Sequence, residues 1–228
     1  MEKKLKPSSL ILLLILFFAF TACTTTAPRI LQLYHQLDVV MDRDSGEQHE
    51  ELSFFLMVED DDGIKDIDEL ILTHPEAELQ WKLSASEWRA IERSGENWIG
   101  GTGFRSPEEM PLPRGRYLVE VTDKAGERAQ SEFILPGDLR GLRDGPIDED
   151  LFPRFYDNGR SGIRPGGQVS VLLTGPEGRF LRSETLDDGV LESGTLDQWK
   201  KEGAGSFRLH RYLDDRGFGL VGGPFPIP

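Results

Sequence analysis

The stretch GRYLVEVTDKAGERAQSEFIL, residues 115–135, carries the clearest fold signal in the chain. Its first half alternates, because Tyr117, Val119 and Val121 fall on one side of an extended chain and Glu120 falls on the other. This period of two is typical of a β-strand with one buried face. We therefore predict a strand over residues 116–122.

A turn follows this strand directly. The sequence Asp123-Lys124-Ala125-Gly126 combines an aspartate with a glycine at the spacing of a tight reversal. Residues 127–135 then return and end in the apolar triplet Phe133-Ile134-Leu135. The pattern predicts a hairpin of the last two strands of a β-rich module that spans residues 30–135.

Earlier in this module, short apolar runs predict strands over residues 52–58, 70–73 and 79–83, with a turn at Asp60-Asp61-Asp62-Gly63. Ser84 and Glu87 then have the spacing of a capping box. This spacing predicts a short helix to about Arg93, in which Trp88 and Ile91 share a buried face.

A second, smaller β-rich module is predicted over residues 152–228, after a linker of turn formers and charges at residues 136–151. Its strand signals are the alternation of Val169, Val171 and Leu173 and a run from Gly205 to Leu213. A capping-box spacing at Thr195 predicts a short helix that contains Trp199.

The hairpin motif Gly115 to Asp123-x-x-Gly126 is paralleled by Gly205 to Asp214-x-x-Gly217. The parallel favours two copies of one architecture, but hairpin chemistry alone can also converge on it.

Several of these motifs resemble immunoglobulin-like and fibronectin-III-like domains of bacteria. The resemblance rests on Pro113-x-Gly115-x-Tyr117 with the strand after it, and on the early strand and turn at residues 58–64. It implies a mainly β fold, with two tandem small β-sandwich (Ig-like) modules, each with a short inserted helix, after an N-terminal signal peptide. Such motifs are common among sandwiches, so they indicate fold more than function.

The N-terminus has the pattern of a secretory signal peptide over residues 1–22. Lys3, Lys4 and Lys6 precede an apolar run of eleven residues, from Leu10 to Phe20. A helix that spans a bilayer needs roughly 20 apolar residues, so this run is too short for a stable span.

Phe20-Thr21-Ala22-Cys23 resembles the lipobox of bacterial lipoproteins, although the family usually has leucine where this chain has Phe20. Cys23 is the only cysteine in the chain. The resemblance implies that Cys23 becomes the acylated first residue of the mature protein, carrying palmitate-type chains, with residues 23–29 as a tether. We then expect an exported, membrane-anchored lipoprotein, at the outer membrane or cell surface rather than the inner membrane.

Composition limits the classes of partner. The chain has 228 residues, with 26 Lys and Arg against 40 Asp and Glu, a net charge of −14. A nucleic-acid partner is not expected, because such an acidic protein repels phosphates. Without a second cysteine no disulfide framework exists, so hydrophobic cores must hold the fold.

The segment around residues 59–69 nearly satisfies the calcium loop of an EF-hand. Its oxygen-bearing candidates are Asp60, Asp62, Asp66 and Glu69. Val58 occupies the first ligand position and supplies no carboxylate, and a strand precedes the loop. An acidic turn without a metal is the interpretation we favour, and calcium is the alternative.

Trp98 lies in Asn97-Trp98-Ile99-Gly100-Gly101, and glycine-rich flanks predict an exposed loop. An exposed indole there is a candidate for stacking on sugar rings, whereas most tryptophans pack in cores.

Catalytic motifs are missing: the four histidines are scattered, without the spacing of metal ligands. We therefore expect a non-catalytic binding or structural module of the cell envelope, with an unknown envelope protein or glycan as its partner. The alternatives are a carbohydrate-binding module that uses exposed tryptophan, and an envelope hydrolase whose site assembles from distant residues.

Overall fold

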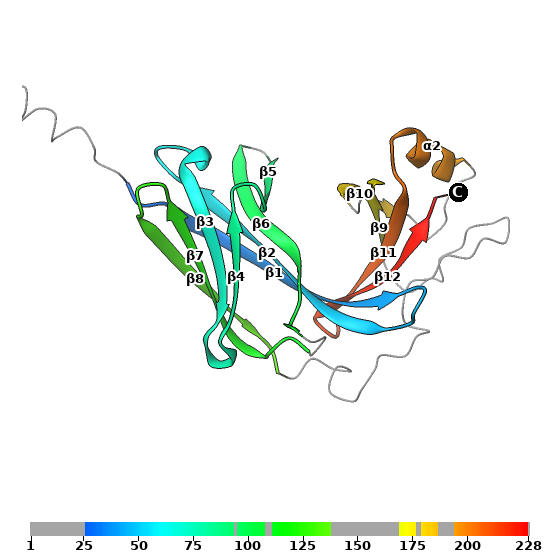
Figure 1. Ribbon diagram of the computed structural model, residues 1–228, viewed down its shortest axis with the longest axis horizontal. Helices are drawn as coiled ribbons and strands as arrows, with labels where there is room; N and C mark the ends of the chain where they lie inside the picture. The colour runs from blue at the N-terminus through cyan, green and yellow to red at the C-terminus, as the bar shows by residue number, and fades with distance from the viewer. Residues whose placement is uncertain are drawn as a thin grey trace, which may run out of the picture.

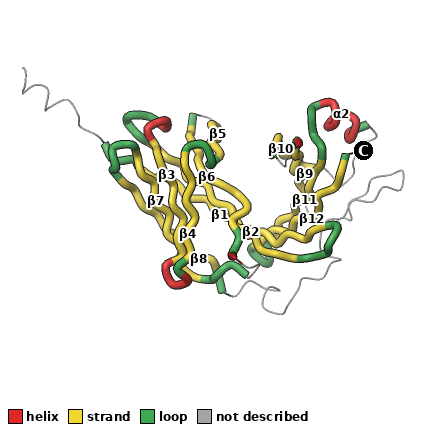
Figure 2. Tube along the Cα trace, viewed as in Figure 1, coloured by secondary structure: helices red, strands yellow, loops and turns green. Residues whose placement is uncertain are grey.

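The computed structural model describes residues 26–93, 95–107, 111–137, 169–176, 179–186 and 194–227. These residues form a mainly β structure with two sheets (Figures 1 and 2). The prediction of a mainly β fold is therefore confirmed. The lipobox, Cys23, and residues 138–168 of the predicted linker and second module lie outside the described residues.

The larger sheet, sheet A, has eight strands in the order β10-β9-β11-β12-β1-β2-β6-β5. Along the chain these strands are β1 (Arg29–Asp42), β2 (Gln48–Glu59), β5 (Arg89–Arg93), β6 (Glu96–Phe104), β9 (Val169–Thr174), β10 (Phe180–Leu186), β11 (Ser206–Leu213) and β12 (Phe218–Pro226).

The smaller sheet, sheet B, has the order β4-β3-β7-β8. Its strands are β3 (Ile67–His74), β4 (Leu79–Ser84), β7 (Gly115–Asp123) and β8 (Arg128–Leu135). The chain enters sheet B from β2 through the predicted turn at residues 60–63 and a single 3-10 turn, Ile64–Asp66.

Sheet B packs on one half of sheet A around the larger hydrophobic core. The predicted alternation in β7 is confirmed, because Tyr117, Val119 and Val121 are fully buried in this core. The opposite wall comes from alternate residues of β1, β2 and β6, such as Leu37 and Phe54. Burial of these apolar side chains is the main stabilising term of the fold.

A second core lies where helix α2 (Thr195–Lys201) packs on β9, β11 and β12. Trp199 is buried there and donates from Nε1 to the Glu184 carboxylate, at 3.2 and 3.3 Å from its two oxygens. The predicted helix in this part of the chain is confirmed, although its N-cap is Gly194, without a side-chain hydrogen bond.

Sheet A is continuous between the two cores. Strand β12 pairs in parallel with β1 over Asp38–Asp42 and antiparallel with β11. Its side chains contribute to both cores, since Phe218 and Leu220 pack in the larger one and Phe225 in the other. The first and last strands of the described chain are thus neighbours in one sheet.

Sheet A bends strongly near β1 and β12, so that its edge strands β5 and β10 lie on the same side of the bend (Figure 1). The two edges approach each other where the Arg89 guanidinium lies over the Phe180 ring, 4.8 Å from the ring centroid. We call the face of sheet A that points away from sheet B, toward the inside of this bend, the inner face.

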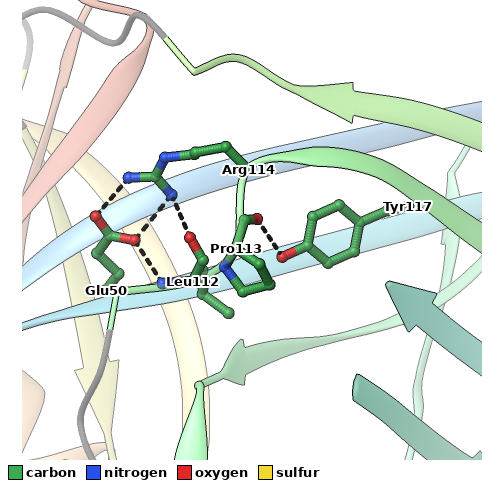
Figure 3. A network of polar contacts seen from close by, with 5 residues as sticks. All are labelled: Glu50, Leu112, Pro113, Arg114 and Tyr117. Atoms are coloured by element: carbon green, nitrogen blue, oxygen red, sulfur yellow. Dashed lines mark hydrogen bonds and ion pairs between the residues drawn. The ribbon is translucent and has the colours of Figure 1, made fainter. Parts of the chain in front are cut away.

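A polar network fixes the connection between the two sheets (Figure 3). Glu50 of β2 accepts from both terminal nitrogens of Arg114, at 2.9 and 2.6 Å, and from the Leu112 amide at 2.9 Å. The Tyr117 hydroxyl donates to the Pro113 carbonyl, at 2.8 Å. The loop before β7 is therefore tied both to β2 and to the strand that follows it.

The predicted helix between Ser84 and Arg93 is wrong. Ser84 and Glu87 do interact, because the Ser84 amide and hydroxyl donate to Glu87 Oε2 at 2.8 and 2.6 Å. Only one turn forms, and the chain continues as β5, which pairs with β6. The expected burial of Ile91 is wrong too, since its side chain is exposed. Pairing along β6 satisfies the backbone of this segment in place of helical hydrogen bonds.

The predicted loop around Trp98 is also a strand, β6. Gly100 and Gly101 are buried, and a Cβ atom on Gly100 would lie 2.1 Å from the Phe54 carbonyl oxygen. Gly100 therefore allows close approach of β6 to β2, Gly101 leaves room for the Phe104 ring, and neither marks a loop.

Candidate functional site

Alternate residues of neighbouring strands place a polar cluster on the inner face. In β1, Leu37 and Val39 point into the larger core, so Tyr34, Gln36 and Asp38 point the other way. The register of β2 and β11 adds further polar side chains to this face: His49, Glu51, His210 and Tyr212. We call these seven residues the inner-face cluster.

A chain of hydrogen bonds links the first part of the cluster. The Tyr34 hydroxyl donates to Gln36 Oε1, and Gln36 Nε2 donates to Asp38 Oδ1 at 2.7 Å. His210 Nε2 lies 2.9 Å from Gln36 Nε2 and 3.1 Å from Asp38 Oδ1. The side chains of Asp38 and His210 are only 15% and 16% exposed, so packing holds both groups in place.

A glycine makes this contact possible across an intervening strand. Asp38 lies on β1 and His210 on β11, and Gly219 of β12 lies between them. A Cβ atom on Gly219 would lie 2.1 Å from Asp38 Oδ1 and 2.5 Å from His210 Nε2. Any side chain at this position would displace the pair.

A second carboxylate lies directly across from Asp38. Glu51 is its register partner on β2, so two acidic residues oppose each other on one face, an arrangement that is normally unfavourable. Glu51 accepts from His49 Nε2 and Arg105 Nε, both at 3.0 Å. Burial alone would raise the pKa of Glu51, but the hydrogen bonds from His49 and Arg105 together lower it. Glu51 therefore stays ionised.

Two tyrosine rings remain accessible beside these buried groups. Tyr34 is 49% exposed and Tyr212 is 44% exposed. The pKa of Tyr34 is raised, first by partial burial of the hydroxyl and then by the charge of Asp38 and by Tyr212. The cluster thus combines rigid hydrogen-bonding groups with exposed aromatic surface.

Trp98, the predicted stacking residue, lies on the same face but is half-buried. Its register partners are Met57 on β2 and Ile91 on β5, and its Nε1 donates to Glu96 Oε2 at 3.3 Å. The indole is therefore less accessible than the rings of Tyr34 and Tyr212.

The predicted acidic turn brings three of its four candidate ligands together. One oxygen each from Asp60, Asp62 and Asp66 lies within 4.8 Å of the others. Glu69 points elsewhere, because it belongs to β3 and forms an ion pair with Lys82. Asp60 and Gly63 also make turn bonds: Asp60 Oδ1 accepts from the Asp62 amide at 2.8 Å, and its carbonyl accepts from the Gly63 amide at 3.0 Å.

One atom of this turn suits a cation. Asp60 Oδ2 is buried and has no hydrogen-bond partner, and an oxygen of that kind is costly unless something neutralises it. Three carboxylates would be a suitable partial ligand set for Ca²⁺, which usually takes six to eight oxygens. The turn interpretation and the calcium interpretation therefore both fit the geometry.

The comparisons with known proteins give no indication of function, so the geometry of the site is the main evidence for it. No protein-family model matches the chain, and a search of curated proteins finds no significant match. Within the part of the chain that the structure describes, none of the helices has the length and hydropathy that a membrane crossing requires.

The sequence does not predict the inner-face cluster, because His210 is one of four scattered histidines without a recognisable spacing. It lies 172 positions from its partner Asp38, and no motif spacing links residues that meet only through a sheet. The alternation of Tyr34, Gln36 and Asp38 between apolar residues was the available signal.

Proposed function

We propose that this protein is a lipid-anchored component of the cell envelope that acts as a non-catalytic binding module through the inner face of sheet A. The anchor part of the proposal rests on the lipobox-like sequence before Cys23 and on the absence of any other cysteine. Two acyl chains on this residue would give stable membrane attachment.

The observation that carries the binding role is the inner-face cluster. Sheet B covers one side of sheet A over half of its width, whereas the inner face presents half-buried polar groups that are already held by hydrogen bonds. Groups fixed in this way lose little entropy when they bind a partner. The directly opposed carboxylates of Asp38 and Glu51 break a rule of sheet stability, which is common at functional sites.

Two features support the proposed immunoglobulin-like character of the sandwich around the larger core. Two sheets of mainly antiparallel strands pack on one core, and Tyr117 donates to a backbone carbonyl four residues upstream. This contact resembles the tyrosine corner of immunoglobulin-like domains.

A glycan is the second candidate partner. Tyr34 and Tyr212 provide exposed rings beside the amide of Gln36 and the carboxylate of Asp38. Aromatic faces next to planar hydrogen-bonding groups suit a hydroxyl-rich ring. On this hypothesis the two tyrosines, more than Trp98, would contact the sugar.

The anchor is tested by replacing Cys23 with serine. We expect fatty-acid labelling to disappear and the protein to leave the membrane fraction. Unchanged labelling and partitioning of the Cys23→Ser protein would contradict the anchor.

The binding face is tested by photo-crosslinking in intact cells. A photoreactive amino acid at position 212 should capture a discrete partner, whereas the same group at position 134 serves as the matched control. Ile134 is 66% exposed on β8 of sheet B, so it reports nonspecific capture from a surface outside the inner face. Equal patterns from both positions would argue against the inner face as the binding surface. Retention on insoluble cell-wall polysaccharide, lost in a Tyr34→Ala, Tyr212→Ala double variant, would favour the glycan.

A further inference from the structure

Three polar atoms of the inner-face cluster form a compact triangle. Its sides are 2.7 Å from Gln36 Nε2 to Asp38 Oδ1, 2.9 Å from Gln36 Nε2 to His210 Nε2, and 3.1 Å from His210 Nε2 to Asp38 Oδ1. All three distances are short enough for hydrogen bonds.

The three contacts cannot all be hydrogen bonds at once. The Gln36 amide nitrogen only donates, and the Asp38 carboxylate only accepts. If His210 Nε2 carries no proton, it can accept from Gln36, but it then presents a lone pair to Asp38. If Nε2 carries a proton, it can donate to Asp38, but it then presents a donor to Gln36. The protonation of one nitrogen therefore decides which side of the triangle is lost.

We infer that His210 is a proton-operated switch in the inner-face cluster. With Nε2 free of a proton, His210 accepts from Gln36 and the chain Tyr34–Gln36–His210 is held together. When His210 becomes a cation, Nε2 donates to Asp38 and forms an ion pair between β11 and β1. Gln36 then loses its contact with His210 but keeps its bond to Asp38.

Few charged groups lie close enough to His210 to influence whether its Nε2 carries a proton. On β1 the titratable neighbours are Asp38 and Tyr34, and on β11 they are Tyr212 and Arg208. Across Asp38, β2 adds Glu51 and His49, which are bonded to each other. Between the pair, β12 contributes only Gly219 and Val221, and β9 places Ser170 opposite His210. Asp38 is therefore the acid in direct contact with the ring.

The consequence concerns the amide of Gln36. One of its N–H groups donates to Asp38 in both states, and the other loses its acceptor when Nε2 of His210 is protonated, so that it can donate to a partner at the inner face. Resting on the proposed function, this makes binding at the inner face depend on the protonation state of His210.

The experiment uses the full acylated chain in detergent micelles, labelled with ¹⁵N only in histidine. The sequence has four histidines, so single His→Gln variants assign the signals. NMR from roughly pH 5 to roughly pH 9 follows whether His210 Nε2 carries a proton. We expect an unprotonated Nε2 at high pH, which gains a proton on acidification, and Gln36 amide signals, from a second sample labelled in glutamine, that move with the same midpoint.

Two variants should move the midpoint in opposite directions. Gln36→Leu removes the donor that favours the unprotonated nitrogen and should move the His210 midpoint upward. Asp38→Asn removes the ion pair and should move it downward, each by roughly half to one pH unit, the value of about one hydrogen bond. Gln80→Leu, on β4 of sheet B, is the control and should leave the midpoint in place.

A proton on Nε2 across the whole pH range would overturn the switch, as would Gln36→Leu with an unchanged midpoint. If Asp38→Asn does not fold, the His210 midpoint in Gln36→Leu alone still tests the switch. The spectra contain no ligand, so this result is independent of the crosslinking result: a switch without a crosslinked partner would contradict only the proposed function.

Discussion

Arg89 of β5 stacks over Phe180 of β10, and this pair joins the two edge strands of an eight-stranded sheet. Edge strands expose unpaired backbone groups, which is a hazard for aggregation. Here the bend of sheet A brings both edges to the same side, and a cation–π contact links them.

We predict that Arg89→Ala loosens both edges of sheet A. A cation–π contact at an exposed site contributes about 0.5 to 1 kcal/mol, so the free energy of unfolding should fall only slightly. Amide hydrogen exchange, followed by mass spectrometry, should become faster in β5 and β10 together. Arg116→Ala is the control, since Arg116 is an exposed arginine on sheet B. Faster exchange in β5 alone would contradict a link between the edges.

The network of Figure 3 predicts a large effect from a single carboxylate. Glu50→Ala leaves the Leu112 amide without its acceptor and leaves the Arg114 guanidinium without its carboxylate partner, with only the Leu112 carbonyl as acceptor. Because the Glu50 side chain is 10% exposed and Arg114 23%, we expect a loss of about 2 to 3 kcal/mol in the free energy of unfolding. Tyr117→Phe, which removes one hydrogen bond, should cost about 1 kcal/mol. Urea unfolding measures both, and equal effects would contradict this ranking.

Acid should destabilise the sandwich through His35. Its ring stacks on Phe133 with centroids 4.2 Å apart, and burial lowers the pKa of His35 below 6.5. The unfolded chain then binds the proton more readily, so the free energy of unfolding should fall as pH drops below about 6.5 and level off beneath the folded pKa. His35→Phe keeps the stacked ring and should flatten this part of the profile. An identical profile for the variant would rule out His35 as the cause.

A side chain at Gly100 should destabilise the fold. Its Cβ would meet backbone atoms of β2, Phe54 O at 2.1 Å and Phe55 Cα at 2.7 Å, and backbone cannot move aside as a flexible side chain does. We expect Gly100→Ala to lower the free energy of unfolding by about 1 to 3 kcal/mol, the usual range for overpacking. Thr102→Ala, at an exposed position of the same strand, is the matched control and should change little.

Neutralising one carboxylate of the acidic turn separates its two interpretations. In EDTA, Asp62→Asn should raise the thermal midpoint slightly, because it relieves repulsion among Asp60, Asp62 and Asp66. Calcium added to the unaltered protein raises the midpoint only if the folded turn binds the ion. A rise that Asp62→Asn abolishes would establish the calcium interpretation, and no rise at millimolar calcium would establish the plain turn.

Local patterns predicted the strands whose two faces differ clearly. β7 alternates residue by residue and was found where expected, with its hairpin partner β8. β1 was not predicted, because polar residues such as Gln36 and Asp38 interrupt its apolar positions. β5 was predicted as helix, because Ser84 and Glu87 form a real turn whose continuation depends on β6.

The candidate site was less predictable than the fold for a related reason. Its central contact joins β1 to β11 across β12, and only the assembled sheet defines that neighbourhood. The sequence also gives no indication of the role of Gly219, because that role depends on the atoms that a Cβ at this position would contact in the folded sheet. The acidic turn, in contrast, is local in sequence, and three of its four proposed residues do lie together.

The parallel pairing of β1 with β12 has a consequence for biogenesis. Residues separated by about 180 positions must meet before sheet A is continuous, and such long-range contacts slow folding. While the C-terminal strand is still being synthesised, β1 therefore lacks its parallel neighbour. On the proposed export of this protein, such late completion of sheet A would keep the chain unfolded for longer and would suit passage through a narrow translocation channel.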